Sequence, residues 1–497
     1  MAEIVREMLI SHDSSETRVG VLEDGKLSEF YIERAKRSVV GNVYLARVRD
    51  VLPGMQAAFV DIGLEKNAFL YVDEVVSETI DGVEGVPRRD IQALLKPGQQ
   101  VMVQVLKDPM GTKGARVTTD VTLPGRFLVL MPFSEFIGIS RKLPDDERER
   151  LHGVIEANAQ KGTGLIVRTA AAGASEKDLL SDLEFLSRLW KRVQHQATEA
   201  LPPEVIYTEM DLALRFVRDV FSEDYRRLLI DDKVTFDKVV SFLKKTSPNL
   251  VRRVQLYRER VTLFDYFGIN EQIDAVLERA VRLPSGGYIA IDQTEALTAV
   301  DVNTGSFTGR KNLEDTILRT NLEAADEVVR QLRLRDIGGI IVIDFIDMED
   351  AFHRAELFRR LNEALERDRT KTRVMEISRL GLVEMTRKNV TDGLYNVLTD
   401  PCPTCKGQGR VLSEATRRIM VERRMREILL AGKSAAYLFG INPETYAIVN
   451  QPGRNVVASL RAETRRQVAI VADPDCGAAE VRTLIEGKAG SIEKAMR

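Results

Sequence analysis

The sequence predicts a multidomain protein of mixed α/β (α+β) class, and three observations support that prediction. The chain has 497 residues, which exceeds the roughly 100–200 residues of a single domain. Residues 288–348 have the pattern of a strand, a long helix and a second strand, which is typical of a βαβ-like unit. Residues 38–123 consist instead of short apolar runs between turns that contain glycine and proline, which is typical of an all-β domain. We therefore expect several domains of at least two architectures.

Charge and cysteine content limit the class of protein. The 72 lysines and arginines nearly balance the 75 aspartates and glutamates, so nucleic-acid binding would depend on local basic patches. The three cysteines, Cys402, Cys405 and Cys476, argue against a disulfide framework and favour a reducing compartment. The N-terminus lacks a signal-peptide pattern, and no apolar run reaches the length of a membrane span. We expect a cytoplasmic protein that does not bind membranes.

The first 124 residues predict β structure. Residues 1–36 form short strands with an Asp24-Gly25 hairpin turn. The following stretch has four strand candidates, at 41–48, 56–62, 68–72 and 99–106. Four or five short strands in such a stretch suit a small OB-fold barrel.

Two aromatic residues of this stretch are candidates for nucleic-acid binding. OB barrels bind single strands by stacking bases on exposed aromatic side chains beside basic groups. Phe59 and Phe69, with Lys113 in a nearby loop, have the residue types for that role. The alternative is that both phenylalanines belong to the barrel core, and the pattern leaves both interpretations open.

Residues 125–202 mix strands with one clear helix. Ser175 and Asp178 have the spacing of a capping box and predict where that helix begins. Arg168 and Thr169 end a predicted strand, and a guanidinium beside a hydroxyl suits a phosphate. Most such arginines are simply solvated, so this pair alone is a weak signal. Residues 203–280 alternate strands and charged helices without an obvious site.

Two strands of the central unit each end in an aspartate. The first run begins at Tyr288 and ends at Asp301, and the second ends at Asp344. Between them, residues 312–335 have apolar positions at helical spacing, with Asn312 as the expected N-cap. Ligands of open α/β sheets bind outside the carboxyl ends of the strands, so this geometry could bring the two aspartates together.

These aspartates have the chemistry of a hard-cation site. With the amide of Asn303, Asp301 and Asp344 offer only oxygen ligands, which suit Mg²⁺ sharing its shell with water and phosphate. The alternative is that each aspartate merely caps the loop that follows its strand. Asp347 is interpreted as a turn or cap residue and not as a third ligand.

Cys402 and Cys405 lie in a glycine-rich knuckle and form half of a tetrahedral Zn²⁺ site. No histidine or other cysteine lies nearby, so a second copy of the chain would supply the other two thiolates, which predicts a zinc-linked homodimer. A redox pair and a site completed by remote residues are the alternatives. Beyond the knuckle, a basic helix at 414–431 and strands at 446–450 and 467–472 predict a small α/β domain for packing or assembly.

Nine short stretches, in order along essentially the whole chain, resemble the bacterial ribonuclease E/G family, most closely its ribonuclease G branch. They are 56–63 (QAAFVDIG), 67–70 (NAFL), 113–115 (KGA), 128–132 (LVLMP), 138–141 (GISR), 166–169 (IVRT), 299–305 (AVDVNTG), 341–348 (IVIDFIDM) and 402–405 (CPTC).

The resemblance implies a domain plan. A ribonuclease-H-like domain would be split into two parts by the RNA-binding barrel, and a DNase-I-like domain would carry catalysis. The implied segments are 1–36 and 211–280 (ribonuclease-H-like), 37–124 (OB-fold), 125–210 (5′-sensor), 281–400 (catalytic), 401–413 (zinc link) and 414–497 (small dimerisation or assembly domain).

The resemblance also implies roles for individual residues. Asp301 and Asp344 would hold Mg²⁺, and Asn303 would assist them. Lys371 stands where ribonuclease E carries an arginine, and a lysine cannot form the same bidentate contact. The remaining implied residues are Phe59, Phe69 and Lys113 for RNA binding, and Gly125, Val129, Arg141, Arg168, Thr169 and Lys371 for sensing a 5′-monophosphate.

The function that follows is an Mg²⁺-dependent endoribonuclease that cuts single-stranded, A/U-rich RNA and leaves 5′-phosphate and 3′-hydroxyl ends. A 5′-monophosphate would stimulate it, and the family implies ribosomal RNA maturation and mRNA decay. The expected assembly is a zinc-linked homodimer, with a dimer of dimers left open. One alternative is a non-catalytic RNA-binding assembly protein with structural aspartates. Another is a metal-dependent phosphomonoesterase, which would release inorganic phosphate and leave the RNA intact.

Overall fold

The computed structural model describes residues 4–34, 38–76, 90–109, 113–158, 162–305, 313–378, 382–389, 393–451, 455–488, 490 and 492. They belong to two compact units, Met1–Leu398 and Thr399–Arg497. The first unit contains four sheets with helices packed on them, and the second contains one. This mixed α/β architecture confirms the predicted fold class.

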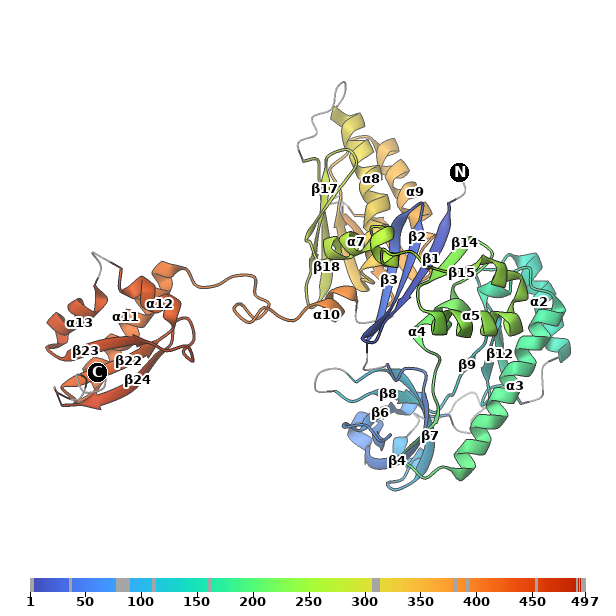
Figure 1. Cartoon of the computed structure of the whole chain (residues 1–497), viewed down its shortest axis with the longest axis horizontal. Helices are drawn as coiled ribbons and strands as arrows, with labels where there is room; N and C mark the ends of the chain where they lie inside the picture. The colour runs from blue at the N-terminus through green and yellow to red at the C-terminus, as the bar shows by residue number, and fades with distance from the viewer. Residues whose placement is uncertain are drawn as a thin grey trace. The chain divides into compact units, whose positions relative to one another are not determined.

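Two stretches far apart in the sequence form the first sheet (Figure 1). Its elements are β1 (Arg6–His12), β2 (Glu16–Glu23), β3 (Lys26–Arg34), α4 (Leu212–Asp219), β14 (Tyr225–Ile230), α5 (Lys233–Thr246), β15 (Val254–Leu256), α6 (Leu263–Tyr266) and α7 (Ile269–Val276). The strand order is β15-β14-β1-β2-β3, and β1 runs parallel to β14 and antiparallel to β2. Alternate side chains of β1 point to opposite faces of the sheet and belong to two different cores. Met8 and Ile10 pack with α4 and α5, whereas Leu9 packs with Phe264 of α6.

The second sheet closes into a barrel. Its elements are β4 (Val43–Leu52), β5 (Ala57–Asp61), β6 (Ala68–Tyr71), α1 (Ile91–Leu94), β7 (Gln100–Lys107) and β8 (Arg116–Thr118). The order is β4-β5-β6-β8-β7, and β4 also pairs with β7, so the five strands close on themselves. This is the architecture expected of an OB-fold. A further strand, β13 (Glu204–Tyr207), comes much later in the sequence, after the elements of the third sheet, and pairs with β4.

The third sheet has the order β11-β12-β10-β9 and packs against two helices. Its elements are β9 (Leu123–Pro124), β10 (Leu128–Met131), β11 (Ile137–Ile139), α2 (Asp145–Asn158), β12 (Gly164–Val167) and α3 (Glu176–Glu199). The predicted capping box begins α3: the Ser175 hydroxyl accepts from the Asp178 amide, and the Asp178 carboxylate accepts from the Ser175 amide. Leu179, Leu186 and Val193 of α3 are buried against the sheet.

The fourth sheet carries the two aspartates that were singled out in the sequence. Its elements are β16 (Ala280–Arg282), β17 (Tyr288–Gln293), β18 (Leu297–Asn303), α8 (Leu313–Leu334), β19 (Gly339–Asp344), α9 (Ala351–Leu365), β20 (Thr372–Ile377), β21 (Leu382–Arg387) and α10 (Leu394–Leu398). The strand order is β16-β17-β18-β19-β21-β20, and α8 and α9 cover one face (Figure 1). Val300 and Ile343 pack under Ala325 and Val328 of α8 in this core.

The central unit corrects one prediction and supports another. The first apolar run is an antiparallel hairpin, β17 and β18, and not one strand, because residues 294–296 form a tight turn in which Thr294 and Leu297 exchange hydrogen bonds. The parallel unit is β18–α8–β19, as the helical spacing predicts. The expected N-cap, Asn312, lies outside the described residues.

The second unit is a small three-stranded domain. Its elements are α11 (Glu414–Ala431), β22 (Ala436–Ile441), α12 (Pro443–Val449), α13 (Val456–Thr464), β23 (Gln467–Ala472) and β24 (Val481–Gly487), with the order β23-β22-β24. The predicted strand 446–450 is wrong, because Asn442 caps a helix there that has Pro443 in its first turn. The central strand, β22, was not predicted.

Candidate active site

Asp301 and Asp344 lie side by side. They are direct partners in the register of the parallel strands β18 and β19. Asp344 is the last residue of β19, and Asp301 lies two residues before the end of β18. Side chains alternate across a strand, so Val300 and Val302 face the helices while Asp301 faces the other side. That other face is open to solvent, as the 52% exposure of Ile340 indicates. The sheet therefore presents two carboxylates together on an accessible surface.

Neighbouring groups leave this pair with excess negative charge. The Asn303 amide donates to Asp301 Oδ2 at 2.8 Å. Burial raises the pKa of Asp344, and the negative charges of Asp301 and Asp347 raise it further. Within the described chain no lysine or arginine forms an ion pair with Asp301 or Asp344, and the nearby Arg279 is paired with Asp292 at 2.6 Å.

The donor set fits a divalent cation that keeps most of its water. The oxygens of two carboxylates and of one side-chain amide are hard donors, which Mg²⁺ prefers. Among the described residues, no histidine, cysteine, aspartate or glutamate joins Asp301 and Asp344 in a group of three that could hold a metal ion. Mg²⁺ does not need such a cage, because waters and a substrate phosphate fill its shell.

The predicted RNA-binding residues of the barrel lie on its surface. Phe59 and Phe69 are cross-strand partners on β5 and β6, half-buried, with ring centroids 5.6 Å apart. Neither belongs to the barrel core, which favours the surface interpretation. Tyr71 extends the row at 4.6 Å from Phe69 and is 40% exposed, and the sequence analysis missed it. Lys113 is exposed near the parallel strand pair β6 and β8.

A groove of about 520 Å³ gathers part of the predicted phosphate-sensing set. Arg141, Arg168 and Thr169 line it, and the Thr169 hydroxyl lies 2.7 Å from that of Ser140. Phe136, which is 64% exposed, also lines the groove and was missed, because an isolated phenylalanine in a loop gives no pattern.

Arg168 is held by one predicted residue, Gly125, and by one that the sequence did not indicate, Asp219. It donates to the Gly125 carbonyl at 2.7 Å and to Asp219 at 2.6 Å. Beneath Gly125, the buried Asp182 carboxylate accepts the amides of residues 126, 127 and 128, and a Cβ at Gly125 would lie 2.5 Å from Asp182 Oδ2. Val129 is half-buried on β10 opposite Ile166.

Lys371 lies in the domain of the fourth sheet, and the loop before it contacts the domain of the third sheet. The Lys142 ammonium donates to the carbonyls of Asp368 and Arg369, at 3.3 Å each. Lys371 itself is exposed at the start of β20. The loop contact brings its backbone towards the segment that carries Arg141.

The cysteine knuckle offers two thiol groups from one chain. Cys402 is exposed and Cys405 is half-buried. Backbone amides of residues 404 and 405 lower the pKa of the Cys402 thiol, and the Gly409 amide donates to Cys405 Sγ at 3.3 Å. Such amide donors stabilise thiolates, so the knuckle fits a Zn²⁺ ion. Cys476 is buried in the domain that follows.

The family model of the ribonuclease E/G family matches residues 122–390. Ribonuclease G of Escherichia coli (strain K12) is 42% identical over 475 residues, which cover 94% of this chain and 97% of that protein. The chain belongs to the ribonuclease E/G family. This membership confirms the resemblance found in the sequence.

Members of both branches of the ribonuclease E/G family match the chain. Ribonuclease G of Haemophilus influenzae is 45% identical over 416 residues, covering 82% of this chain and 85% of that protein. Ribonuclease E of the same organism is 39% identical over 470 residues, covering 91% of this chain but 50% of its own length.

Among the described residues, no helix has both the length and the apolar character needed to cross a membrane.

Proposed function

We propose that this chain is an Mg²⁺-dependent endoribonuclease that cuts single-stranded, A/U-rich RNA internally. The observation that carries the proposal is the pairing of Asp301 with Asp344 on the open face of the central sheet. Membership in the ribonuclease E/G family supports RNA as the substrate. The cellular roles that we propose are ribosomal RNA maturation and mRNA decay in the cytoplasm.

Asp301 and Asp344 would hold the ion against the scissile phosphate, and Asn303 would fix the orientation of Asp301. When bound, Mg²⁺ would polarise the phosphate and lower the pKa of the attacking water. The water oxygen bonds to phosphorus while the bond from phosphorus to the 3′-oxygen breaks in line. The 3′-oxygen leaves and takes up a proton, so the products carry a 3′-hydroxyl and a 5′-phosphate.

The other surfaces would bind and select the RNA. Phe59 and Phe69 would stack bases, and Lys113 would contact the backbone. The groove with Arg168 and Thr169 would favour a 5′-monophosphate, because a guanidinium and a hydroxyl both donate to phosphate oxygens. Gly125, Val129, Arg141 and Lys371 would complete this sensor.

A fluorescent single-stranded A/U-rich oligonucleotide tests this function. We expect internal cleavage with Mg²⁺ and none after chelation, and faster cleavage with a 5′-monophosphate than with a 5′-hydroxyl end. The products should ligate through their 5′-phosphates without prior treatment. Binding without cleavage in every condition would instead favour a non-catalytic RNA-binding assembly protein, and release of inorganic phosphate from an intact chain would favour a phosphomonoesterase.

Replacing Phe69 should weaken RNA binding without affecting the chemistry. Loss of one base-stacking platform costs about 1–3 kcal/mol, so Phe69→Ala should raise the Kd of the oligonucleotide by about 5- to 150-fold. Fluorescence anisotropy measures this change. Phe352→Ala, at a 73%-exposed phenylalanine of α9, is the control and should bind normally. If Phe69→Ala and the wild type bind the oligonucleotide with equal affinity, Phe69 does not contact RNA and its role is structural.

Zn²⁺ would link two copies of the chain through Cys402 and Cys405. Cys405→Ser should therefore convert a dimer into a monomer and remove the bound zinc, with one ion per two chains in the wild type. Light scattering and metal analysis measure both quantities, and Cys476→Ala should change neither. A wild-type monomer, or a dimer without zinc, would contradict the shared site. A dimer of dimers would appear as twice the dimer mass.

A further inference from the structure

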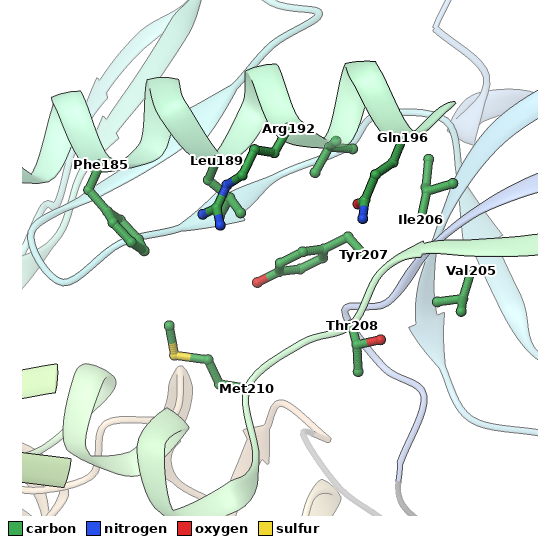
Figure 2. A pocket seen from close by; sticks show the side chains of 10 residues that line it. Phe185, Leu189, Arg192, Gln196, Val205, Ile206, Tyr207, Thr208 and Met210 are labelled. Carbon is green, nitrogen blue, oxygen red and sulfur yellow. The ribbon is translucent and has the colours of Figure 1, made fainter. Parts of the chain in front are cut away.

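A hollow of about 440 Å³ lies between helix α3 and the segment that leads from β13 towards α4 (Figure 2). Phe185, Leu189, Arg192 and Gln196 reach it from α3. These positions recur at the three- and four-residue spacing of one helix face. Tyr207, at the end of β13, and Met210 reach it from the other side. None of these residues belongs to the catalytic pair, the barrel surface or the phosphate groove described above.

The hollow borders the barrel. Strand β13 pairs with β4, a strand of the barrel sheet, so the wall that carries Tyr207 is an extension of that sheet. The opposite wall is the helix of the sensor domain, whose Val193 is buried beneath the hollow. The hollow therefore lies where the two domains that are proposed to hold RNA meet.

Arg192 supplies an uncompensated positive charge. It forms no ion pair or hydrogen bond with the residues that the structure describes, whereas Arg188, one turn earlier on α3, pairs with Glu184 at 3.4 Å. The nearest buried carboxylate of the wall, Glu209, is already paired with Arg218 at 2.8 Å. Figure 2 shows the Arg192 guanidinium and the Tyr207 hydroxyl directed into the same space. On the Arg192 side, the hollow therefore has a place for one anionic group.

The rest of the lining suits a flat, largely apolar body with polar edges. Phe185 and Tyr207 are both half-buried aromatic rings, and Leu189 and Met210 add apolar surface. The Gln196 amide offers both a donor and an acceptor. Burial raises the pKa of Tyr207, and the Glu209 carboxylate, to which its hydroxyl is hydrogen-bonded, raises the pKa further. The ring of Tyr207 is therefore the part that a ligand would contact. A ring system with hydrogen-bonding edges and an attached phosphate combines these features.

We propose that this hollow holds one nucleotide of the single-stranded RNA substrate, with its base against Phe185 and Tyr207 and its phosphate on Arg192. The proposal rests on the proposed RNA-cleaving function and adds a third contact to the barrel and the phosphate groove. A nucleotide within a strand is favoured over a free one because the hollow is open and one of its walls, β13, pairs with the barrel strand β4. A strand contact at this position would lengthen the bound segment of RNA.

The test measures binding in the full-length chain with Asp344→Asn, which prevents cleavage. The probe is a fluorescein-labelled single-stranded A/U oligoribonucleotide with a 5′-hydroxyl end, so that the phosphate groove does not contribute. Tyr207→Leu should raise the Kd by about 5- to 150-fold, whereas Tyr207→Phe, which keeps the ring, should stay within about threefold of the parent. Equal affinities of the leucine and phenylalanine variants would overturn the proposal.

Arg192 has its own readout. Each phosphate contact to a single strand contributes about 0.7 to the slope of log Kd against log salt concentration, so Arg192→Gln should reduce that slope by about 0.7. Arg188→Gln, on the same helix but outside the hollow, should leave the slope unchanged. An unchanged slope for Arg192→Gln would overturn the phosphate contact.

A crosslinking experiment does not depend on the folding of any variant. An oligonucleotide that contains 4-thiouridine, irradiated with the Asp344→Asn chain, should crosslink to the peptides that carry Phe185 or Tyr207. Protection of these peptides by adenosine 5′-monophosphate alone, without any crosslink to the oligonucleotide, would indicate a free nucleotide and overturn the strand contact. Failure of the proposed function is distinguishable, because the wild type would then leave the oligonucleotide uncut in Mg²⁺, whether or not it binds it.

Discussion

Asp344→Asn should reduce cleavage of a single-stranded oligonucleotide by about a thousandfold or more. The substitution keeps the size of the side chain but removes one of the two charges that would bind Mg²⁺ beside the scissile phosphate. Transition-state stabilisation by such an ion is worth several kcal/mol, and a thousandfold change corresponds to about 4 kcal/mol. Single-turnover kinetics with saturating enzyme measures the loss separately from any change in RNA affinity.

Glu384→Gln is the matched control. Glu384 is exposed on the same face of the sheet, opposite Val342 on the strand next to β19, but away from the ends where the aspartates lie. It should cut at nearly the wild-type rate, because general negative charge on this face is not what the reaction needs. Cleavage by Asp344→Asn at a rate similar to that of the control would remove the paired aspartates from the mechanism.

Arg387→Leu should destabilise the central domain by about 3–5 kcal/mol, because it leaves two carboxylates without their cation in the protein interior. Arg387 ends β21 and donates to Asp368 and Asp336, at 2.7 Å each. The side chains of Arg387 and Asp368 are both 3% exposed. Amide hydrogen exchange in β19 and β21 measures the local opening free energy, which global unfolding of a multidomain chain would obscure.

Two further variants make this result specific. Arg359→Leu removes an exposed arginine of α9 that pairs with Glu356 and Glu363, and it should leave the exchange rates unchanged. Adding Asp368→Asn to Arg387→Leu should recover part of the loss, because one unpaired charge is then gone. If the loss of stability in the double variant instead equals the sum of the losses in Arg387→Leu and Asp368→Asn, the two changes are independent, and a buried unpaired charge is not the cause.

The aspartate pair was accessible to sequence reasoning, whereas the shape of the groove that Arg168 lines was not. Asp301 and Asp344 each follow an apolar run separated by a long periodic helix, and a parallel unit with this order brings its strand ends together. Asp219 contacts Arg168 from 51 positions away, and Asp182 accepts the amides of residues 126 and 127 from 56 and 55 positions away. No local sequence pattern encodes these contacts.

The errors in secondary structure have local causes. The hairpin of β17 and β18 was read as one strand, because its turn spans only residues 294–296 and alternation continues on both sides. Residues 446–449 are apolar enough to resemble a strand, but Asn442 and Pro443 begin a helix there. A cap and a proline at the first turn are stronger evidence than a short apolar run, whose periodicity cannot distinguish the two states.

The split first sheet imposes an order on folding during synthesis. The amide of His12 in β1 bonds to Asp231, a residue 219 positions later that directly follows β14. At about 5–20 residues per second, the ribosome would need roughly 10–45 s to deliver that partner. Throughout this interval β1 has one unpaired edge, with Met8 and Ile10 lacking their final neighbours. The barrel and the domain of the third sheet emerge meanwhile and can fold first. Closure of the N-terminal sheet is therefore a late step that joins domains already formed.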